Sequence, residues 1–110
     1  MSSMKNSEVC IRSSLVNVKN LFEVINACLP KQGAIEVQHD QEGKEHSWHT
    51  HETDETIVVL EGKLQFYWEG GKEICQAGDV IELPRGTKHG SIALDSNAKY
   101  IIIFEHIDLT

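Results

Sequence analysis

Two histidines separated by one residue, His49 and His51, are the part of the sequence best suited to chemistry. On a β-strand this spacing places both imidazoles on the same face, about 7 Å apart, where they can converge on one metal ion. Glu55 has the same parity but would lie about 20 Å from His49 on a straight strand, so the chain must bend between them. His89 follows a tight turn at residues 84–87 and is expected to close the site from the other side. These four side chains are the candidate metal ligands.

The elements that must hold these side chains are short β-strands. Beyond Gly33 the sequence has β-rich runs divided by glycine-containing turns, a pattern typical of a closed antiparallel barrel or sandwich. The expected strands are residues 34–37, 57–60, 64–68, 74–76, 80–83, 91–94 and 100–104. Turns are expected at residues 61–63, 69–72, 77–79 and 84–86, with successive strands paired antiparallel. The polar residues 38–47 are expected to form a connection that leads into the histidines.

Before the strands, an amphipathic pattern predicts a short helix. Its apolar residues recur at the spacing of one helical face: Leu15, Val18, Leu21, Phe22, Ile25 and Leu29. Ser14 is the expected N-cap, and Pro30 ends the helix. Because Asn17, Asn20 and Asn26 are poor helix formers, an irregular arm is the alternative.

Length and composition favour one soluble domain. A chain of 110 residues is long enough for a single core, so we expect one domain over residues 1–110, with an arm or helix at 1–32 and a barrel core at 33–110. The chain is 40% hydrophobic and 25% charged, and no apolar run approaches the ~20 residues of a membrane span. Residues 1–8 lack the apolar region of a secretory signal. We therefore expect a cytoplasmic protein that does not enter a membrane.

Charge and cysteine usage narrow the partners. A net charge of −7 provides no basic field to neutralise phosphates, which argues against nucleic acid and anionic membranes. Cys10, Cys28 and Cys75 form an odd set without close spacing, so neither a disulfide framework nor a thiolate metal site is expected. The partner should be a metal ion or a small molecule.

The residues around the candidate ligands resemble the motifs of the cupin family. The first motif, G-x5-H-x-H-x3-E-x6-G, is matched at every fixed position, by Gly43, His49, His51, Glu55 and Gly62. The second, G-x5-P-x-G-x2-H-x3-N, is matched by Gly78, Pro84, Gly86 and His89, with Ala93 in place of the final asparagine. The motifs span residues 43–93, and flanking strands extend the likeness to about residues 33–106.

This resemblance implies an all-β fold, a small antiparallel double-stranded β-helix or jelly-roll barrel. It also assigns metal coordination to the three histidines and the glutamate. Cupins include dioxygenases, isomerases, decarboxylases and lyases alike, so the resemblance does not select a reaction. Members often pair through an N-terminal segment, from which we expect a homodimer.

Three neutral imidazoles and one carboxylate around a divalent ion leave a net charge of about +1 and open coordination positions. Such a site suits Fe, Mn, Ni, Zn or Cu, and the ligand types do not choose among them. One hypothesis is an enzyme acting on a small oxygen-rich molecule, such as an organic acid, a diketone or a sugar derivative. The other is a non-catalytic, metal-dependent binding module that acts with a partner protein. An empty, vestigial site is disfavoured because all four ligand positions are filled.

The remaining histidines and the aromatic residues near the motif have no assigned chemistry. His39, His46 and His106 lack motif support, and His46 is the first candidate among them because it lies three residues before His49. Trp48 and Thr50 alternate with the ligands and should face the outside of the strand. Leu64, Phe66 and Trp68 share a face that is expected to pack in the core.

Three charged residues near the motifs leave alternatives open. Arg85 and Lys88 flank the turn before His89 and could steer an anionic ligand, but exposed basic side chains on turns are usually only solvated. Glu82 either faces solvent or adds a second carboxylate to the cavity. No general acid or base is assigned from the sequence.

Overall fold

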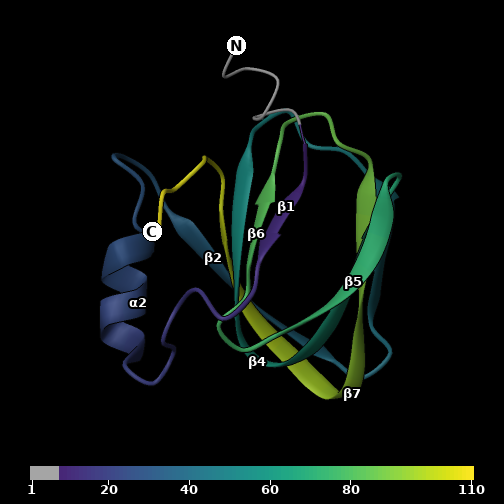
Figure 1. Cartoon of the computed structure of the whole chain (residues 1–110), viewed down its shortest axis with the longest axis horizontal. Helices are drawn as coiled ribbons and strands as arrows, with labels where there is room; N and C mark the ends of the chain where they lie inside the picture. Colours follow the sequence, from purple (N-terminus) through teal and green to yellow (C-terminus); the bar gives the residue numbers. More distant parts are fainter. Residues whose placement is uncertain (1–7) are drawn as a thin grey trace.

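The structure, a computed structural model, describes residues 8–110. The first seven residues, on which the prediction of no secretory signal largely rests, lie outside the described part. The elements along the chain are β1 (Cys10–Arg12), α2 (Leu21–Cys28), β2 (Ile35–Gln41), β3 (Glu45–His49), β4 (Glu55–Trp68), β5 (Gly71–Gln76), β6 (Val80–Leu83) and β7 (His89–Ile103). Figure 1 shows the strands wrapped around a common interior, with α2 packed on the outside.

Two long strands, β4 and β7, build the barrel by each pairing with more than one neighbour. The sheet order is β1-β6-β4-β7-β2, with β5 paired to β4 and β3 paired to β7, and every pairing is antiparallel. The start of β4 pairs with β6 and its end with β5, while the start of β7 pairs with β3 and its end with β2. The predicted all-β antiparallel barrel is confirmed.

The bend in β4 occurs at Gly62, where the sequence predicts a turn at residues 61–63. That prediction is wrong: β4 runs through this point with two register shifts against β7. Gly62 has φ of +80°, and a Cβ there would lie 1.6 Å from the carbonyl oxygen of Asn97. The glycine therefore bends a continuous strand against its neighbour and does not reverse the chain.

The sequence predicts that the polar residues 38–47 form one connection. This prediction is wrong, because they divide between two strands. Residues 38–41 complete β2, residues 45–47 begin β3, and a short turn with Gly43 at φ of +85° joins them. Their polarity concealed the strands because Gln38 and His46 face an internal cavity. A polar inner face reverses the alternation expected for a strand of an apolar barrel.

The helix is shorter than predicted and begins later. α2 covers only Leu21–Cys28, and its N-cap is Asn20, whose side chain accepts a hydrogen bond from the Glu23 N–H. Ser14 is not the cap: it has φ of +52°, and its N–H donates to Asp79 at 2.8 Å. The segment before the helix is thus fastened to the turn between β5 and β6.

The helix buries a different face from the predicted one. Val24 and Cys28 are its buried residues, whereas Phe22, part of the predicted face, is 82% exposed. Val24 and Cys28 pack against the outer side of the barrel, on Val58, Val80, Ile101 and Ile103. A second cluster fills the interior, with Ile57, Leu64, Phe66, Ile81 and Tyr100 among its members.

Cys10, Cys28 and Cys75 are all free thiols, and the last two are buried. Across residues 8–110 no helix has the length and apolar character needed to cross a bilayer.

Candidate metal centre

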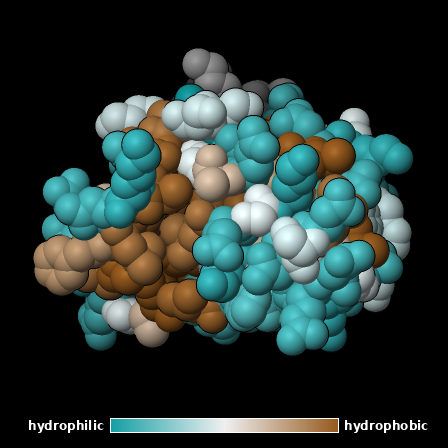
Figure 2. Space-filling model, turned by 90° about the horizontal axis from the view of Figure 1, so that it is seen from below, coloured by the Kyte–Doolittle hydropathy of each residue, from teal (hydrophilic) through white to brown (hydrophobic). Residues whose placement is uncertain are grey.

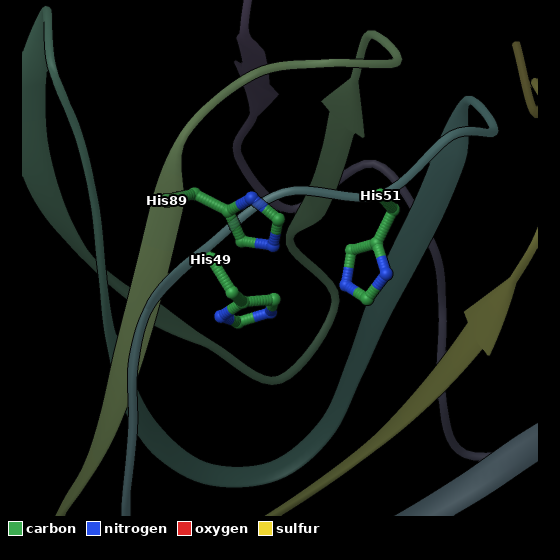
Figure 3. A group of neighbouring side chains, drawn as sticks. All are labelled: His49, His51 and His89. Carbon is green, nitrogen blue, oxygen red and sulfur yellow. The ribbon is translucent and has the colours of Figure 1, made fainter.

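Three of the four predicted ligands meet inside one end of the barrel. The potential ligand atoms of His49, His51 and His89 all lie within 4.8 Å of one another. Their ring centroids are 4.3 to 5.3 Å apart, and Figure 3 shows the rings turned toward a shared space. This spacing allows one small cation to contact all three imidazoles.

Strand pairing positions two of these histidines. His49 is the last residue of β3, His89 is the first of β7, and the two are register partners across the β3–β7 ladder. A register shift between His46 and His49 accompanies the end of β3. The ring of His89 also stacks on Phe66 of β4, with centroids 5.5 Å apart.

The spacing of His49 and His51 predicts that both lie on one strand. In the structure, His51 instead reaches the site from a loop. β3 ends at His49, and the carbonyl oxygen of His51 accepts a hydrogen bond from the Gly86 N–H at 2.8 Å. Asp54 of the same loop accepts one from the Arg85 N–H at 2.9 Å. The loop carrying His51 is thus fastened to the turn that precedes His89.

Hydrogen bonds to backbone carbonyls orient two of the imidazoles. His89 Nδ1 lies 2.8 Å from the Thr87 carbonyl oxygen, and His49 Nδ1 contacts the Ser47 carbonyl oxygen. A carbonyl only accepts, so each Nδ1 carries the proton in the neutral ring and Nε2 keeps its lone pair. Such hydrogen bonds commonly fix the tautomer of metal-binding histidines.

Burial favours the neutral form of two of the imidazoles, those of His89 and His51. The pKa of His89 falls to about 4, mainly because the ring is buried and in smaller part because His49 and His51 lie beside it. Burial also lowers the pKa of His51, with His49 as the second cause. A neutral imidazole is the form that binds a metal ion, so these rings are ready ligands near neutral pH.

Glu55, the fourth predicted ligand, opens β4 beside the histidines but is not part of the three-histidine group. It is only 3% exposed, and its Oε2 lies 3.2 Å from His51 Nε2, but the two atoms do not have the geometry of a hydrogen bond. This oxygen is the only buried side-chain polar atom without a hydrogen-bond partner among the described residues. Burial raises the pKa of Glu55 to about 7, and the charge of Glu36 is the second cause.

The three histidines and Glu55 open onto a cavity of about 380 Å³. Its apolar wall comes from β4, from β7 and from the residue after β7, and it includes Ile57, Leu64, Phe66, Ile102 and Phe104. Its polar wall comes mainly from β2 and β3 and includes Glu36, Gln38 and His46. The volume suits a small organic molecule.

Beside this cavity lies a polar network that the sequence did not reveal. Asp40 is only 2% exposed, and Tyr100 donates a hydrogen bond to its Oδ2 at 2.6 Å. His46 Nε2 lies 3.0 Å from the same oxygen, and Gln38 Nε2 donates to Oδ1 at 3.2 Å. Glu36, Gln38 and Asp40 alternate along β2, and this alternation could have indicated a strand with a polar inner face. The polarity of the whole stretch instead led to the prediction of a loop.

The other residues considered from the sequence lie away from the cavity. Arg85 and Lys88 do not line it, and the Arg85 side chain is 75% exposed. Glu82 pairs with Arg12 at 3.1 Å beside a separate, smaller cavity that His106 also lines. His39 lies within hydrogen-bond distance of Asn97.

Trp48 faces outward as predicted. Its side chain is 48% exposed, and its ring lies edge-on to Tyr67 with centroids 4.7 Å apart.

Comparison with known proteins identifies the fold family. Residues 36–104 match the model of the cupin domain. A cupin protein from Bacteroides fragilis is 27% identical with a TM-score of 0.56, over 62% of this chain and 60% of that one. No functionally curated protein matches the sequence.

Two further solved structures have names that mention an activity. A DMSP lyase from Ruegeria pomeroyi is 24% identical with a TM-score of 0.59, over 63% of this chain and 36% of that one. A sugar phosphate isomerase of the cupin superfamily from Silicibacter pomeroyi is 23% identical with a TM-score of 0.56, over 62% and 46%. The chain thus spans less than two thirds of each of these three relatives, and at such identity the last two show the fold alone.

Proposed function

The chain belongs to the cupin family, and from that premise we propose that it uses His49, His51, His89 and Glu55 to bind one divalent transition-metal ion. At this centre it binds or transforms a small oxygen-rich molecule held in the adjoining cavity. The ion is one of Fe, Mn, Ni, Zn or Cu, since imidazole and carboxylate ligands suit all five.

The observation that carries this proposal is the buried, unpartnered Oε2 of Glu55 beside neutral imidazoles. A buried carboxylate oxygen without a hydrogen bond is destabilising, which explains its raised pKa. A divalent cation would compensate the carboxylate charge, and the nearby imidazoles would supply neutral donors. The residues present therefore fit the metal ion that cupins of this motif hold.

The chemistry follows from the ligand set and from the walls around it. When bound, such an ion would supply a Lewis-acid centre with open positions for adjacent oxygens of a ligand. The carbonyl oxygens of Ser47 and Thr87 keep the rings of His49 and His89 oriented toward it. Phe66 and Leu64 of the apolar wall limit the water around the bound molecule.

An enzyme is the first reading of this site. Cupins with the same fold include a protein described as a DMSP lyase and one described as a sugar phosphate isomerase, so the barrel supports different reactions. His46, held by the buried Asp40 on the cavity wall, is a candidate for moving a proton. The alternative is a non-catalytic, metal-dependent small-molecule-binding module that acts with a partner protein.

Metal analysis tests the proposal. Protein purified without a histidine tag should contain close to one metal ion per chain, and His49→Ala should lose it. Loss of a residue that only orients a metal ligand typically lowers metal affinity by about 10- to 100-fold. Because His49 is itself a proposed ligand, we expect the metal affinity of His49→Ala to fall by at least this much. His39→Ala is the matched control, because His39 does not line the cavity. Equal metal content in wild type and His49→Ala would refute the proposed site. Added-back metals, with oxygen, organic-acid and sugar screens, then separate an enzyme from a binding module.

A further inference from the structure

The cavity beside the metal ligands carries negative charge without any compensating cation from lysine or arginine. Among the described residues, none of the side chains that line it belongs to either type. Glu36 and Glu55 are the carboxylates on its wall. Glu55 and Glu36 together would offset the charge of a bound divalent ion, and no lysine or arginine among the lining residues would then attract an anionic tail.

Two further polar side chains on the wall, those of His46 and Gln38, can also present acceptors to a ligand. Asp40 is buried and its carboxylate only accepts, so the Asp40 contact requires the proton of His46 to be on Nε2. The neutral ring then keeps an acceptor at Nδ1. Gln38 uses its amide nitrogen toward Asp40 and keeps its carbonyl oxygen as an acceptor.

Glu36 is the residue on this wall whose charge is free to meet a ligand. It lies on β2, where Glu36 and Gln38 alternate along the face that lines the cavity. No hydrogen bond or ion pair to its carboxylate is present among the described residues, in contrast to Asp40, whose two oxygens are both used. Acceptors of this kind favour hydroxyl groups and ammonium groups.

We propose that this cavity selects a ligand that bears hydroxyl or amino donors and no negative charge, and that Glu36 sets this preference. The inference rests on the proposed function, because the metal ion anchors the other end of the ligand. Of the candidate classes, it favours neutral or amino-bearing sugar derivatives over organic acids.

The test uses three hydroxamates that share a metal-chelating head and a two-methylene linker and differ in the end group, which sets the charge of the tail. The probes are β-alanine hydroxamate, which is cationic, butyrohydroxamate, which is neutral, and succinic acid monohydroxamate, which is anionic. Their dissociation constants are measured by calorimetry on protein whose metal content has been determined first. The cationic probe should bind about tenfold more tightly than the anionic one, as expected for one charge at the edge of a partly solvated cavity.

Two variants assign this preference to Glu36. Glu36→Gln should reduce the ratio of cationic to anionic affinity severalfold, while Glu69→Gln, the same charge change at an exposed turn residue outside the cavity, should leave it unchanged. If the protein has its normal metal content but does not prefer the cationic probe, or binds none of the probes, this inference is wrong while the proposed metal site still stands. An unchanged ratio in Glu36→Gln would overturn the role of Glu36. Absence of metal from the wild type would instead contradict the proposed function.

Discussion

Glu55 stands out at the scale of single residues because its position is unfavourable without a ligand. Its carboxylate is buried, one of its oxygens has no hydrogen-bond partner in the part of the chain that the structure describes, and burial raises its pKa to about 7. Functional sites often retain groups that weaken the fold, since evolution selects for the bound state. The same residue should therefore limit stability in the metal-free protein and improve affinity in the metal-bound one.

This trade-off predicts opposite effects for Glu55→Gln. In metal-free protein at pH 8 the variant should be more stable than wild type by about 1–3 kcal/mol, because a neutral amide replaces a buried charge. With metal present, the variant should gain less stability than wild type. Thermal unfolding with and without added metal measures both effects, and a variant destabilised in the metal-free state would contradict the account.

The pH dependence follows from the direction of the same shift. The pKa of Glu55 in the folded state, about 7, lies above its ordinary value of 4.5. Between these two pH values the folded state therefore binds more protons than the unfolded state. The free energy of unfolding of metal-free wild type should therefore fall as the pH rises from about 4.5 to about 7, because Glu55 is then ionised more readily in the unfolded state. The stability difference between Glu55→Gln and wild type should be near zero at pH 4 and should grow to a plateau above pH 8. His89 titrates in both proteins and cancels in the difference.

At the scale of elements, the two long strands explain why separate motifs meet at one site. β4 begins with Glu55 and β7 begins with His89, and β3 places His49 beside His89. Gly62 allows β4 to bend where it changes partners. A change at this glycine should therefore disturb the barrel even though it lies outside the metal site.

Glycine substitutions test this bend. Gly62→Ala should destabilise the fold by about 3 kcal/mol or more, because its Cβ would collide with the backbone of Asn97. Gly43→Ala is a matched control: its φ is also positive, but no atom lies within 4 Å of the added Cβ. We expect the control to cost about 1–2 kcal/mol, the strain of the left-handed conformation alone. Equal losses in chemical denaturation would show that the close approach at Gly62 is unimportant.

The sequence predicts the barrel well where local pattern and burial agree. Residues 80–83 and most other apolar runs lie in strands as expected. The prediction fails where a long-range contact decides the structure: at Gly62, where a strand continues through an apparent turn, and at residues 38–47, whose polar side chains face a cavity. The helix start fails for the same reason, because Asp79 from a distant turn holds Ser14 outside a helix.

In the candidate site, too, some features could be predicted from the sequence and others could not. Motif spacing named the three histidines that come together, and it named Glu55 beside them. It could not predict that His51 lies in a loop tied to Gly86, since that hydrogen bond joins residues far apart in sequence. Nor could it predict Asp40 with His46 and Tyr100, because such a network depends on which strands become neighbours.

At the scale of the whole molecule, one side remains strongly apolar. Figure 2 shows hydrophobic residues gathered on the side that carries α2. The exposed apolar side chains of α2 and β2 include Leu21, Phe22 and Val37. Among residues 8–110, β2 pairs only with β7, so its other edge is free within this part of the chain.

These features agree with the homodimer expected from the sequence, which remains a prediction. Sedimentation at micromolar concentration should give a dimer, and Phe22→Ser together with Val37→Thr should shift it toward monomer. Trp48→Ser, at an exposed apolar side chain of β3, tests whether any loss of apolar surface has this effect. A wild-type monomer under these conditions would refute the prediction.

The central claim is that His49, His51, His89 and Glu55 hold one metal ion, and anomalous diffraction from metal-loaded crystals tests it most directly. The account predicts a single strong peak at coordination distance, about 2.0–2.2 Å, from Nε2 of His49 and His89, a ring nitrogen of His51 and an oxygen of Glu55. A peak bound by the histidines but distant from Glu55 would remove the carboxylate from the ligand set. A loaded crystal with its peak elsewhere, or with none, would contradict the claim itself.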